Sequence, residues 1–195
     1  SNGTPLQLGQ ELTLQDLTGL KFNAPLDYNG SDPVGDFRYQ VNDGAGQSNS
    51  VVIGSVTLQV LPINDAPIAA SKSLTVNEES VGTAVGLSAP SDVDGNPLTI
   101  RVSGLPTLGV VTLADGSPLS INQVLTSGAL TGLKYNAPAD YNGSDVVGSF
   151  SYTVDDGQGA GNSQATGSVT LFVTPINDAP VVDSKSLLVN EGSVG

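Results

Sequence analysis

The sequence contains no cysteine, histidine, methionine or tryptophan. Without cysteine or histidine the chain cannot build a zinc finger, an iron–sulfur cluster, a cysteine nucleophile or a Ser-His-Asp triad. A metal ion could be held only by oxygen atoms, and an all-oxygen ligand set favours Ca²⁺ or Mg²⁺ over Zn²⁺ or Cu²⁺. The composition therefore leaves the hard divalent cations as the metals to consider.

Positive charge is also scarce. The 195 residues include 6 Lys+Arg against 19 Asp+Glu, which gives a formal charge of −13. A chain of this charge repels phosphate backbones, so nucleic acid is not expected as a partner. No apolar run approaches the roughly 18–20 residues of a membrane span, so membrane insertion is not expected. Both ends look cut, and we expect the chain to be an internal piece of a longer protein.

The residues that are abundant favour strands and turns over helices. Fifteen of the 19 acidic residues are aspartate, and the chain has 24 glycines and 12 prolines scattered along its length. Aspartate, glycine and proline are typical of turns, whereas helical surfaces favour glutamate, lysine and alanine. This balance predicts an all-β protein.

An internal repeat organises the chain. KFNAPLDYNGSD at 21–32 returns as KYNAPADYNGSD at 134–145, and PINDAP at 62–67 returns at 175–180, both at an offset of 113 residues. A period of this length indicates whole domains in tandem. The predicted organisation is the C-terminal part of one repeat, a complete repeat, and the first strand region of the next (1–62, 63–175 and 176–195); a boundary near 114 remains an alternative.

Within one repeat the apolar residues alternate with polar ones over short segments. The predicted strands are 71–77, 97–104, 109–114, 149–156 and 167–174. Period-2 alternation is typical of strands with one buried face. No segment has a helical period, and 119–131 has room for one helical turn at most. About seven strands per repeat predict tandem immunoglobulin/cadherin-like β-sandwich domains.

Several residues are predicted to form the core. Phe150 and Tyr152 stand at i and i+2, so both face one side of a strand. Tyr28 and Tyr141, in the repeated DYNG motif, are predicted to bond nearby backbone through their hydroxyls. The aliphatic residues expected on the opposing face are Leu74, Val76, Val81, Val85, Leu87, Leu98, Ile100 and Val102.

Acidic motifs carry the functional prediction. Asp92 and Asp94 have the spacing that lets two carboxylates of a turn face one cation, and Ca²⁺ takes six to eight oxygen ligands. Paired carboxylates also repel unless a cation neutralises them. Each aspartate taken alone can equally be an ordinary turn residue, as at Asp94-Gly95 and Asp156-Gly157.

The order VNE, SDVDGN, DYN, VDDGQG, PINDAP resembles cadherin repeats, and is more closely similar to the bacterial cadherin-like repeats of large secreted RTX (type I secreted) adhesins. The resemblance implies a β-sandwich extender domain in an adhesin stalk, used in cell adhesion or biofilm formation. It implies Ca²⁺ at the junctions, neighbouring repeats as partners, a distal ligand bound elsewhere, and the surface of a Gram-negative bacterium.

The resemblance also implies the metal ligands, residue by residue. The first linker would use Asp27, Asn64, Asp65, Asp92, Asp94 and Asp156. The second linker would use Glu78, Asp140, Asn177 and Asp178. Ala66 and Ala179 replace acidic or amide positions of the family, so we expect one or two ions per junction and dissociation constants of roughly 10⁻⁴–10⁻³ M or somewhat tighter.

Two other classes of function stay open. The first is a carbohydrate- or ligand-binding cadherin-like module, which usually needs exposed aromatic side chains. The second is a hydrolase that uses the Asp92/Asp94 pair, although such spacing fits a turn better than the two walls of a cleft. We do not expect an enzyme.

Overall fold

The computed structural model describes residues 3–143, 146–159, 161–192 and 194. The chain divides into two compact units, which are described separately. Unit 1 comprises Ser1–Asp65 with Val93–Gly95, and unit 2 comprises Ala66–Asp92 with Asn96–Gly195. Strands make up 33% of the described residues and helices 5%, which confirms the all-β prediction. None of the described helices has the length and apolarity to cross a membrane.

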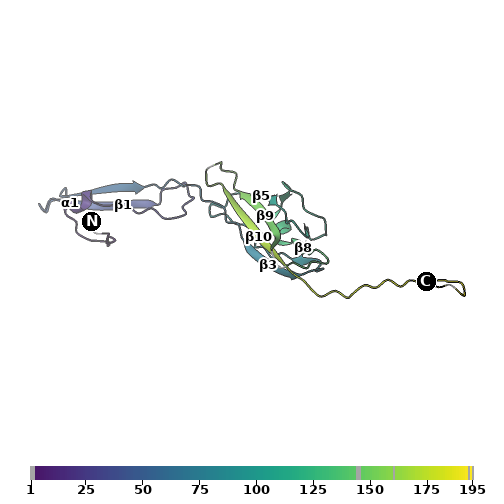
Figure 1. Cartoon of the computed structure of the whole chain (residues 1–195). Helices are drawn as coiled ribbons and strands as arrows, with labels where there is room; N and C mark the ends of the chain where they lie inside the picture. Colours follow the sequence, from purple (N-terminus) through teal and green to yellow (C-terminus); the bar gives the residue numbers. More distant parts are fainter. Residues whose placement is uncertain (1–2, 144–145, 160, 193, 195) are drawn as a thin grey trace. The chain divides into compact units, whose positions relative to one another are not determined.

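Unit 2 is a β-sandwich (Figure 1). In its described residues the larger sheet has the strand order β3-β10-β9-β5-β7: Lys72–Asn77, Gln164–Thr174, Val146–Asp155, Thr99–Gly104 and Val124–Leu125. The smaller sheet has the order β4-β8-β6: Thr83–Ala84, Lys134–Asn136 and Val110–Thr112. A single-turn helix, α2 (Ser127–Thr131), follows β7 and is capped by the Thr126 side chain.

The first and last strands of unit 2 run parallel. β3 pairs with β10 in a register that joins Leu74 to Leu171 and Val76 to Val173, whereas the other strand pairs of the unit are antiparallel in its described residues. Because both strands run the same way, the chain arrives at one end of the sandwich and departs from the opposite end.

Alternation along β9 and β10 builds the core. Phe150 and Tyr152 are completely buried with stacked rings 5.9 Å apart, as predicted from their spacing. A β-bulge near Gly148, where φ is 123°, adds one residue to β9. It allows Val147 to face the core together with Phe150, although the two are three residues apart.

Most predicted aliphatic core positions are confirmed. Those that are buried or packed against the core are Leu74, Val76, Val85, Leu87, Leu98, Ile100 and Val102. Val81 is the exception and is exposed, because the chain turns after β3 and carries it away from the sheet. The strands β4, β7 and β8 were not predicted, since two or three residues are too few to show an alternation. β6 is equally short (Val110–Thr112), but it lies within the apolar segment 109–114, which was predicted as a strand.

Unit 1 contains a short helix and a hairpin. α1 (Leu14–Thr18) precedes β1 (Gly35–Asn42), which pairs antiparallel with β2 (Val51–Leu58). This hairpin repeats β9 and β10 at the offset of 113 residues. Tyr39 stands opposite Gly54, just as Tyr152 stands opposite Gly167. A Cβ on either glycine would overlap the tyrosine ring, so the aromatic ring takes the place of the missing side chain.

The DYNG motif at 27–30 forms a corner in which the Tyr28 hydroxyl bonds nearby backbone, as predicted for this residue. The Tyr28 hydroxyl donates a hydrogen bond to the carbonyl oxygen of Asp32 at 2.5 Å, within a single loop. The ring lies over Gly30, where a Cβ would collide with it, and Tyr141 lies over Gly143 in the same way. The glycine of the motif is thus required by the tyrosine two residues before it.

The repeat offers a matched test of one buried hydroxyl. The Tyr152 hydroxyl donates to the carbonyl oxygen of Ala70 at 2.9 Å, and burial raises its pKa. Tyr152→Phe should lower the free energy of unfolding by about 1–2 kcal/mol, because the Ala70 carbonyl loses its donor. Tyr39→Phe should cost less than half as much, and urea denaturation followed by circular dichroism measures both. Equal losses would contradict the prediction.

Candidate functional site

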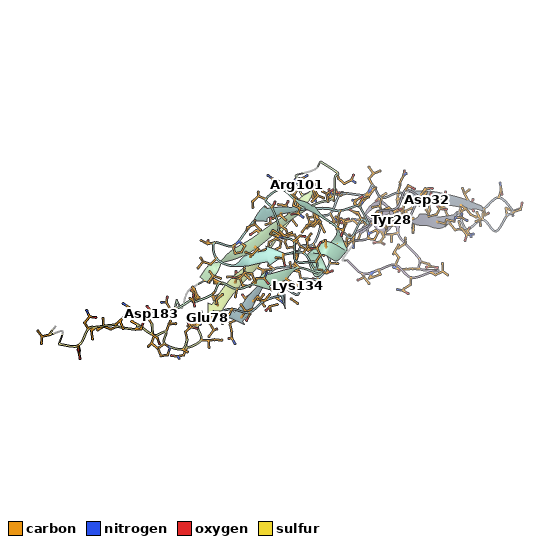
Figure 2. The ribbon with its side chains drawn as sticks, turned by 90° about the vertical axis from the view of Figure 1, so that its right-hand side faces the viewer. Tyr28, Asp32, Glu78, Arg101, Lys134 and Asp183 are labelled. Carbon is orange, nitrogen blue, oxygen red and sulfur yellow. The ribbon has the colours of Figure 1, made fainter. Side chains whose placement is uncertain are left out.

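Three carboxylates gather where the C-terminal segment leaves the unit 2 sandwich. Glu79 follows β3, Asp140 lies in the loop between β8 and β9, and Asp178 lies in the second PINDAP linker. One carboxylate oxygen of each lies within 4.8 Å of the others, and all three residues are exposed. Figure 2 labels the neighbouring Glu78 at this end of the sandwich. We call these three residues the acidic cluster.

The local backbone brings the acidic cluster together. The Glu79 amide donates to the carbonyl oxygen of Pro138 at 3.1 Å, which joins the turn after β3 to the β8–β9 loop. Glu79 and Asp140 both take left-handed conformations, with φ of 61° and 52°. Apart from glycine, mainly asparagine, aspartate and histidine adopt this conformation, so Glu79 holds strain of about 1–3 kcal/mol and Asp140 holds less.

Glu78 fixes the base of the linker behind the acidic cluster. Its carboxylate is buried and accepts hydrogen bonds from the backbone amides of Tyr141 and Ile176, one on each oxygen. Its own amide donates to the carbonyl oxygen of Thr174, at the end of β10. One side chain thereby ties β3 to the DYNG loop and to the first residues of the linker.

The acidic cluster fits a calcium ion. Ca²⁺ binds oxygens at 2.3–2.6 Å, so two oxygens on one ion lie at most about 4.6–5.2 Å apart, which the spacing within the cluster satisfies. Carboxylate oxygens are also the preferred ligands of this hard cation. Three negative charges this close repel each other, and a divalent cation would remove that repulsion.

The ligands predicted at the second linker have separate places in this arrangement. Asp140 and Asp178 lie in the acidic cluster, and Glu78 lies behind it. Asn177 is exposed and donates through its side-chain amide to the Asp178 carbonyl oxygen at 3.0 Å. Sequence reasoning missed Glu79, because the matching position of the next repeat is Gly192 and no repeated carboxylate points to it.

Predicted ligands in the loops of unit 2 hold those loops together. Asp92 accepts the Asn96 amide at 3.4 Å, and Gln158 donates through its side-chain amide to the Asn96 side chain at 3.1 Å. Asp156 is buried directly after β9 and accepts the Gln158 amide at 2.8 Å. One oxygen of Asp92 is shielded from solvent. Within unit 2 these bonds connect Asn96 to Asp92 and to Gln158 in the loop after β9.

The predicted ligands that belong to unit 1 also bond to backbone. The Asp65 amide donates to the Asp94 carboxylate at 2.7 Å, and Asn29 donates to the Asp94 carbonyl oxygen at 3.3 Å. Asn64 donates to the Asp65 carbonyl oxygen at 3.2 Å, as Asn177 does in the second linker. Asp27 is exposed with φ of 53°, which repeats the conformation of Asp140.

Other aspartates act as turn residues. The Asp43 carboxylate accepts the Ala45 amide and the Asp115 carboxylate accepts the Ser117 amide, and these backbone bonds lower the pKa of both aspartates. An aspartate that bonds the amide two residues further on is an Asx-turn. These two carboxylates are accounted for by the turns alone.

Comparison with known proteins identifies the fold family. A family model described as "Bacterial Ig domain" matches residues 64–171, which is more than half of the chain. The chain belongs to the bacterial Ig domain family. Bacterial Ig domains are non-catalytic, and they are common in surface proteins. The match covers β3 to β9 and most of β10.

Two further comparisons add no functional argument. No curated protein matches the chain. One solved structure, an endo-fucoidan hydrolase from glycoside hydrolase family 107, aligns with 72% of this chain at 16% identity and a TM-score of 0.34. The bacterial Ig chain spans only 19% of that enzyme. Within unit 2, Tyr135, Phe150 and Tyr152 are buried, so they provide no aromatic platform for a sugar.

Two adjacent glutamates of this bacterial Ig domain provide a matched pair of substitutions. Glu78→Gln should lower the free energy of unfolding by about 1–3 kcal/mol, because an amide group cannot accept both the Tyr141 and Ile176 amides. Glu79→Gln should change it by less than about 0.5 kcal/mol, since Glu79 is exposed and loses only repulsion. Urea denaturation in a chelator measures both values. A larger loss for Glu79→Gln would show that the roles are reversed.

Proposed function

We propose that the chain is a segment of the extender, or stalk, of a large bacterial surface adhesin that supports cell adhesion or biofilm formation. The observation that carries this proposal is the parallel pairing of β3 with β10. A domain whose chain arrives at one end and departs at the other adds its full length to a tandem array. Membership of a non-catalytic family common in surface proteins supports the same function.

The repetition of small structural details supports the proposal that the repeats serve to lengthen a stalk. The tyrosine–glycine pairs of the hairpins, the DYNG corner and the threonine-capped helical turn occur in both units at the same offset. An enzyme rarely needs its active site repeated at a fixed interval. Copies that reproduce these details therefore fit domains that set a distance along a stalk. The partners of each repeat would then be its neighbours in the chain, and a distal region would bind the adhesin ligand.

We further propose that Ca²⁺ rigidifies the junctions. After unit 2, the acidic cluster of Glu79, Asp140 and Asp178 would hold the ion, with Asn177 beside it. At the first linker the proposed ligands are Asp27, Asn64, Asp65, Asp92, Asp94 and Asp156. A bound Ca²⁺ would supply positive charge and bonds to oxygen at these positions. Each cluster has few carboxylates, so dissociation constants of about 10⁻⁴–10⁻³ M fit an extracellular module.

Contacts within the chain hold the second PINDAP linker in a position suited to binding Ca²⁺. Glu78 anchors Ile176 and leaves Asp178 beside Asp140. Prolines at both ends of PINDAP restrict the backbone on either side of the acidic residue. Without a cation the clustered carboxylates repel, and the linker would move more freely. The stiffness of the stalk would then depend on the calcium concentration.

The cellular setting is the part of the proposal that rests on the resemblance. RTX adhesins exported by type I secretion meet high calcium only outside the cell, where weak calcium sites would fill. An extracellular place on the surface of a Gram-negative bacterium therefore suits sites of this affinity. A stalk without cysteine would be stabilised there by ions instead of disulfides.

A thermal melt tests the calcium proposal. About 10 mM CaCl₂ should stabilise the chain by about 1.4–2.7 kcal/mol over a chelator, which raises the midpoint by roughly 5–10 °C. Equal MgCl₂ should have less than half of this effect, because Mg²⁺ requires stricter octahedral geometry. If the melting midpoint is the same in CaCl₂ and in chelator, the proposal is wrong and the proposed ligands are turn residues only.

Two pairs of substitutions locate the ion. Asp140→Asn with Asp178→Asn should weaken calcium binding at the second linker at least tenfold in isothermal titration calorimetry. Asp43→Asn with Asp115→Asn removes the same charge from turns outside the proposed ligands and should leave binding within twofold. Equal losses in both double variants would indicate a general charge effect, and would overturn the assignment of the acidic cluster.

A further inference from the structure

The outer side of the larger sheet in unit 2 has an open groove. The groove measures about 370 Å³ and is lined by Thr99, Arg101, Thr153, Asp155 and Gln164. These residues belong to three neighbouring strands, β5, β9 and β10, so the groove is built on regular sheet and not on loops. Its volume lies near the lower end of the range for small-molecule sites. Arg101 is labelled in Figure 2.

The register of the strands brings the lining side chains onto one face. Arg101 of β5 stands opposite Thr153 of β9. Asp155 of β9 stands opposite Thr99 of β5 on one side and Gln164 of β10 on the other. The residues that alternate with them along β5 and β9 are buried in the core, so the lining side chains point away from it.

One positive and one negative group share this face. Arg101 and Asp155 are the only charged residues in the sequences of β5, β9 and β10. Among the described residues no ion pair joins the two, whereas Arg38 and Asp36 of unit 1 lie 3.3 Å apart. The two charges in the groove therefore do not neutralise each other by direct contact.

Both charged groups are held in place by other partners. The Nη1 atom of Arg101 donates to the carbonyl oxygen of Asn122 at 2.8 Å. The Asp155 carboxylate accepts the Gly157 amide at 2.7 Å and the side-chain amide of Gln164 at 2.5 Å, one on each oxygen. A guanidinium has five N–H donors, and each carboxylate oxygen has a second lone pair, so both groups can bind a ligand without giving up these bonds.

Pairing of the two strands does not depend on the polar residues at this end of the groove. Asp155 opposite Gln164 corresponds, at the repeat offset of 113, to Asn42 opposite Val51 in the first hairpin. That hairpin has the same register with an uncharged residue and an apolar residue in these places. The carboxylate and the amide of the groove are therefore not needed for the strand pairing, and the surface can serve recognition.

We propose that the groove binds a uronic acid residue of a polysaccharide. Arg101 would hold the sugar carboxylate, because a guanidinium offers two parallel N–H donors that match the two oxygens of a carboxylate. A hydroxyl of the same sugar would donate to Asp155. The hydroxyls of Thr99 and Thr153 would bond further sugar hydroxyls, since each can both donate and accept.

The lining residues select this ligand over related ones. None of them is aromatic, so a neutral sugar would have no ring to stack on and would leave Arg101 without a carboxylate. Asp155 repels a second negative charge placed beside the first, and the chain as a whole carries a formal charge of −13. The groove therefore suits a sugar chain in which uronic acid residues are separated by neutral sugars.

The inference goes beyond the proposed stalk function and needs no calcium. All five lining residues belong to unit 2, and none of them is among the proposed calcium ligands. A stalk with such a groove would bind a surrounding polysaccharide along its side, in addition to the ligand bound by a distal region.

Titration of the intact chain in a chelator, followed by heteronuclear NMR, tests the class of ligand. Methyl glucuronide should shift amide signals of β5 and β9 and should bind at least about tenfold more tightly than methyl glucoside, which has no carboxylate. Acetate and free alanine have a carboxylate but no sugar hydroxyls, and should bind at least about tenfold more weakly than the glucuronide. Absence of glucuronide binding, or equal binding of any of these controls, would overturn the proposal.

Substitutions locate the site. Arg101→Gln should weaken glucuronide binding at least about tenfold, and Arg101→Lys at least about threefold, because lysine has the charge without the paired donors. Lys72→Gln removes a cation of the same unit from outside the groove and should leave binding within about twofold. Equal losses for Arg101→Gln and Lys72→Gln would indicate a general charge effect and would overturn the site.

A second position keeps the test independent of Arg101. Thr153→Val preserves the branched shape of the side chain on β9 and removes only the hydroxyl. It should weaken glucuronide binding at least about threefold, while the thermal midpoint of the chain stays the same within a few degrees. Unchanged binding by Thr153→Val would show that the sugar does not lie in the groove.

Discussion

The parallel pairing of β3 with β10 joins the first strand of unit 2 to its last, over a separation of nearly a hundred residues. The pairing closes the larger sheet and helps to bury Leu171 and Val173. It also delivers the chain to the far end of the sandwich, where Glu78 bonds Ile176 and fixes the first residues of the linker. The placement of the acidic cluster follows from this one pairing, because Glu79 and Asp178 each lie just beyond one of the two strands.

Two adjacent glutamates have different roles at the end of the sandwich where the linker begins. Glu78 is buried and shielded from solvent, and each of its carboxylate oxygens accepts a hydrogen bond from a backbone amide. It therefore stabilises the fold. Glu79 points into solvent from a left-handed backbone and adds a third charge to Asp140 and Asp178. Strain and repulsion at one exposed place disfavour folding of the chain alone. Their concentration beside a linker is the physical reason for the proposal that they bind a cation.

The two hairpins separate local from long-range determinants of structure. Tyr39 opposite Gly54 and Tyr152 opposite Gly167 adopt one geometry, because the register and the ring–glycine contact depend only on neighbouring residues. Burial differs completely between the hairpins, since it depends on strands that lie far away in the sequence. A hairpin can therefore have its native register while the burial of its apolar face depends on segments outside the hairpin.

The sequence by itself determined the features whose signals span a few residues. These are the all-β class, the repeat, the strands β3, β5, β6, β9 and β10, the buried Phe150 and Tyr152, and the Tyr28 corner. Alternation and turn chemistry act locally, so they can be read along the chain. Only the tertiary structure decided that β3 lies parallel to β10, that Val81 is exposed, and that Glu79 joins the acidic cluster while Glu78 lies behind it. The short strands β4, β7 and β8 belong with these, because each exists through pairing with a distant segment, and no local pattern encodes the partner.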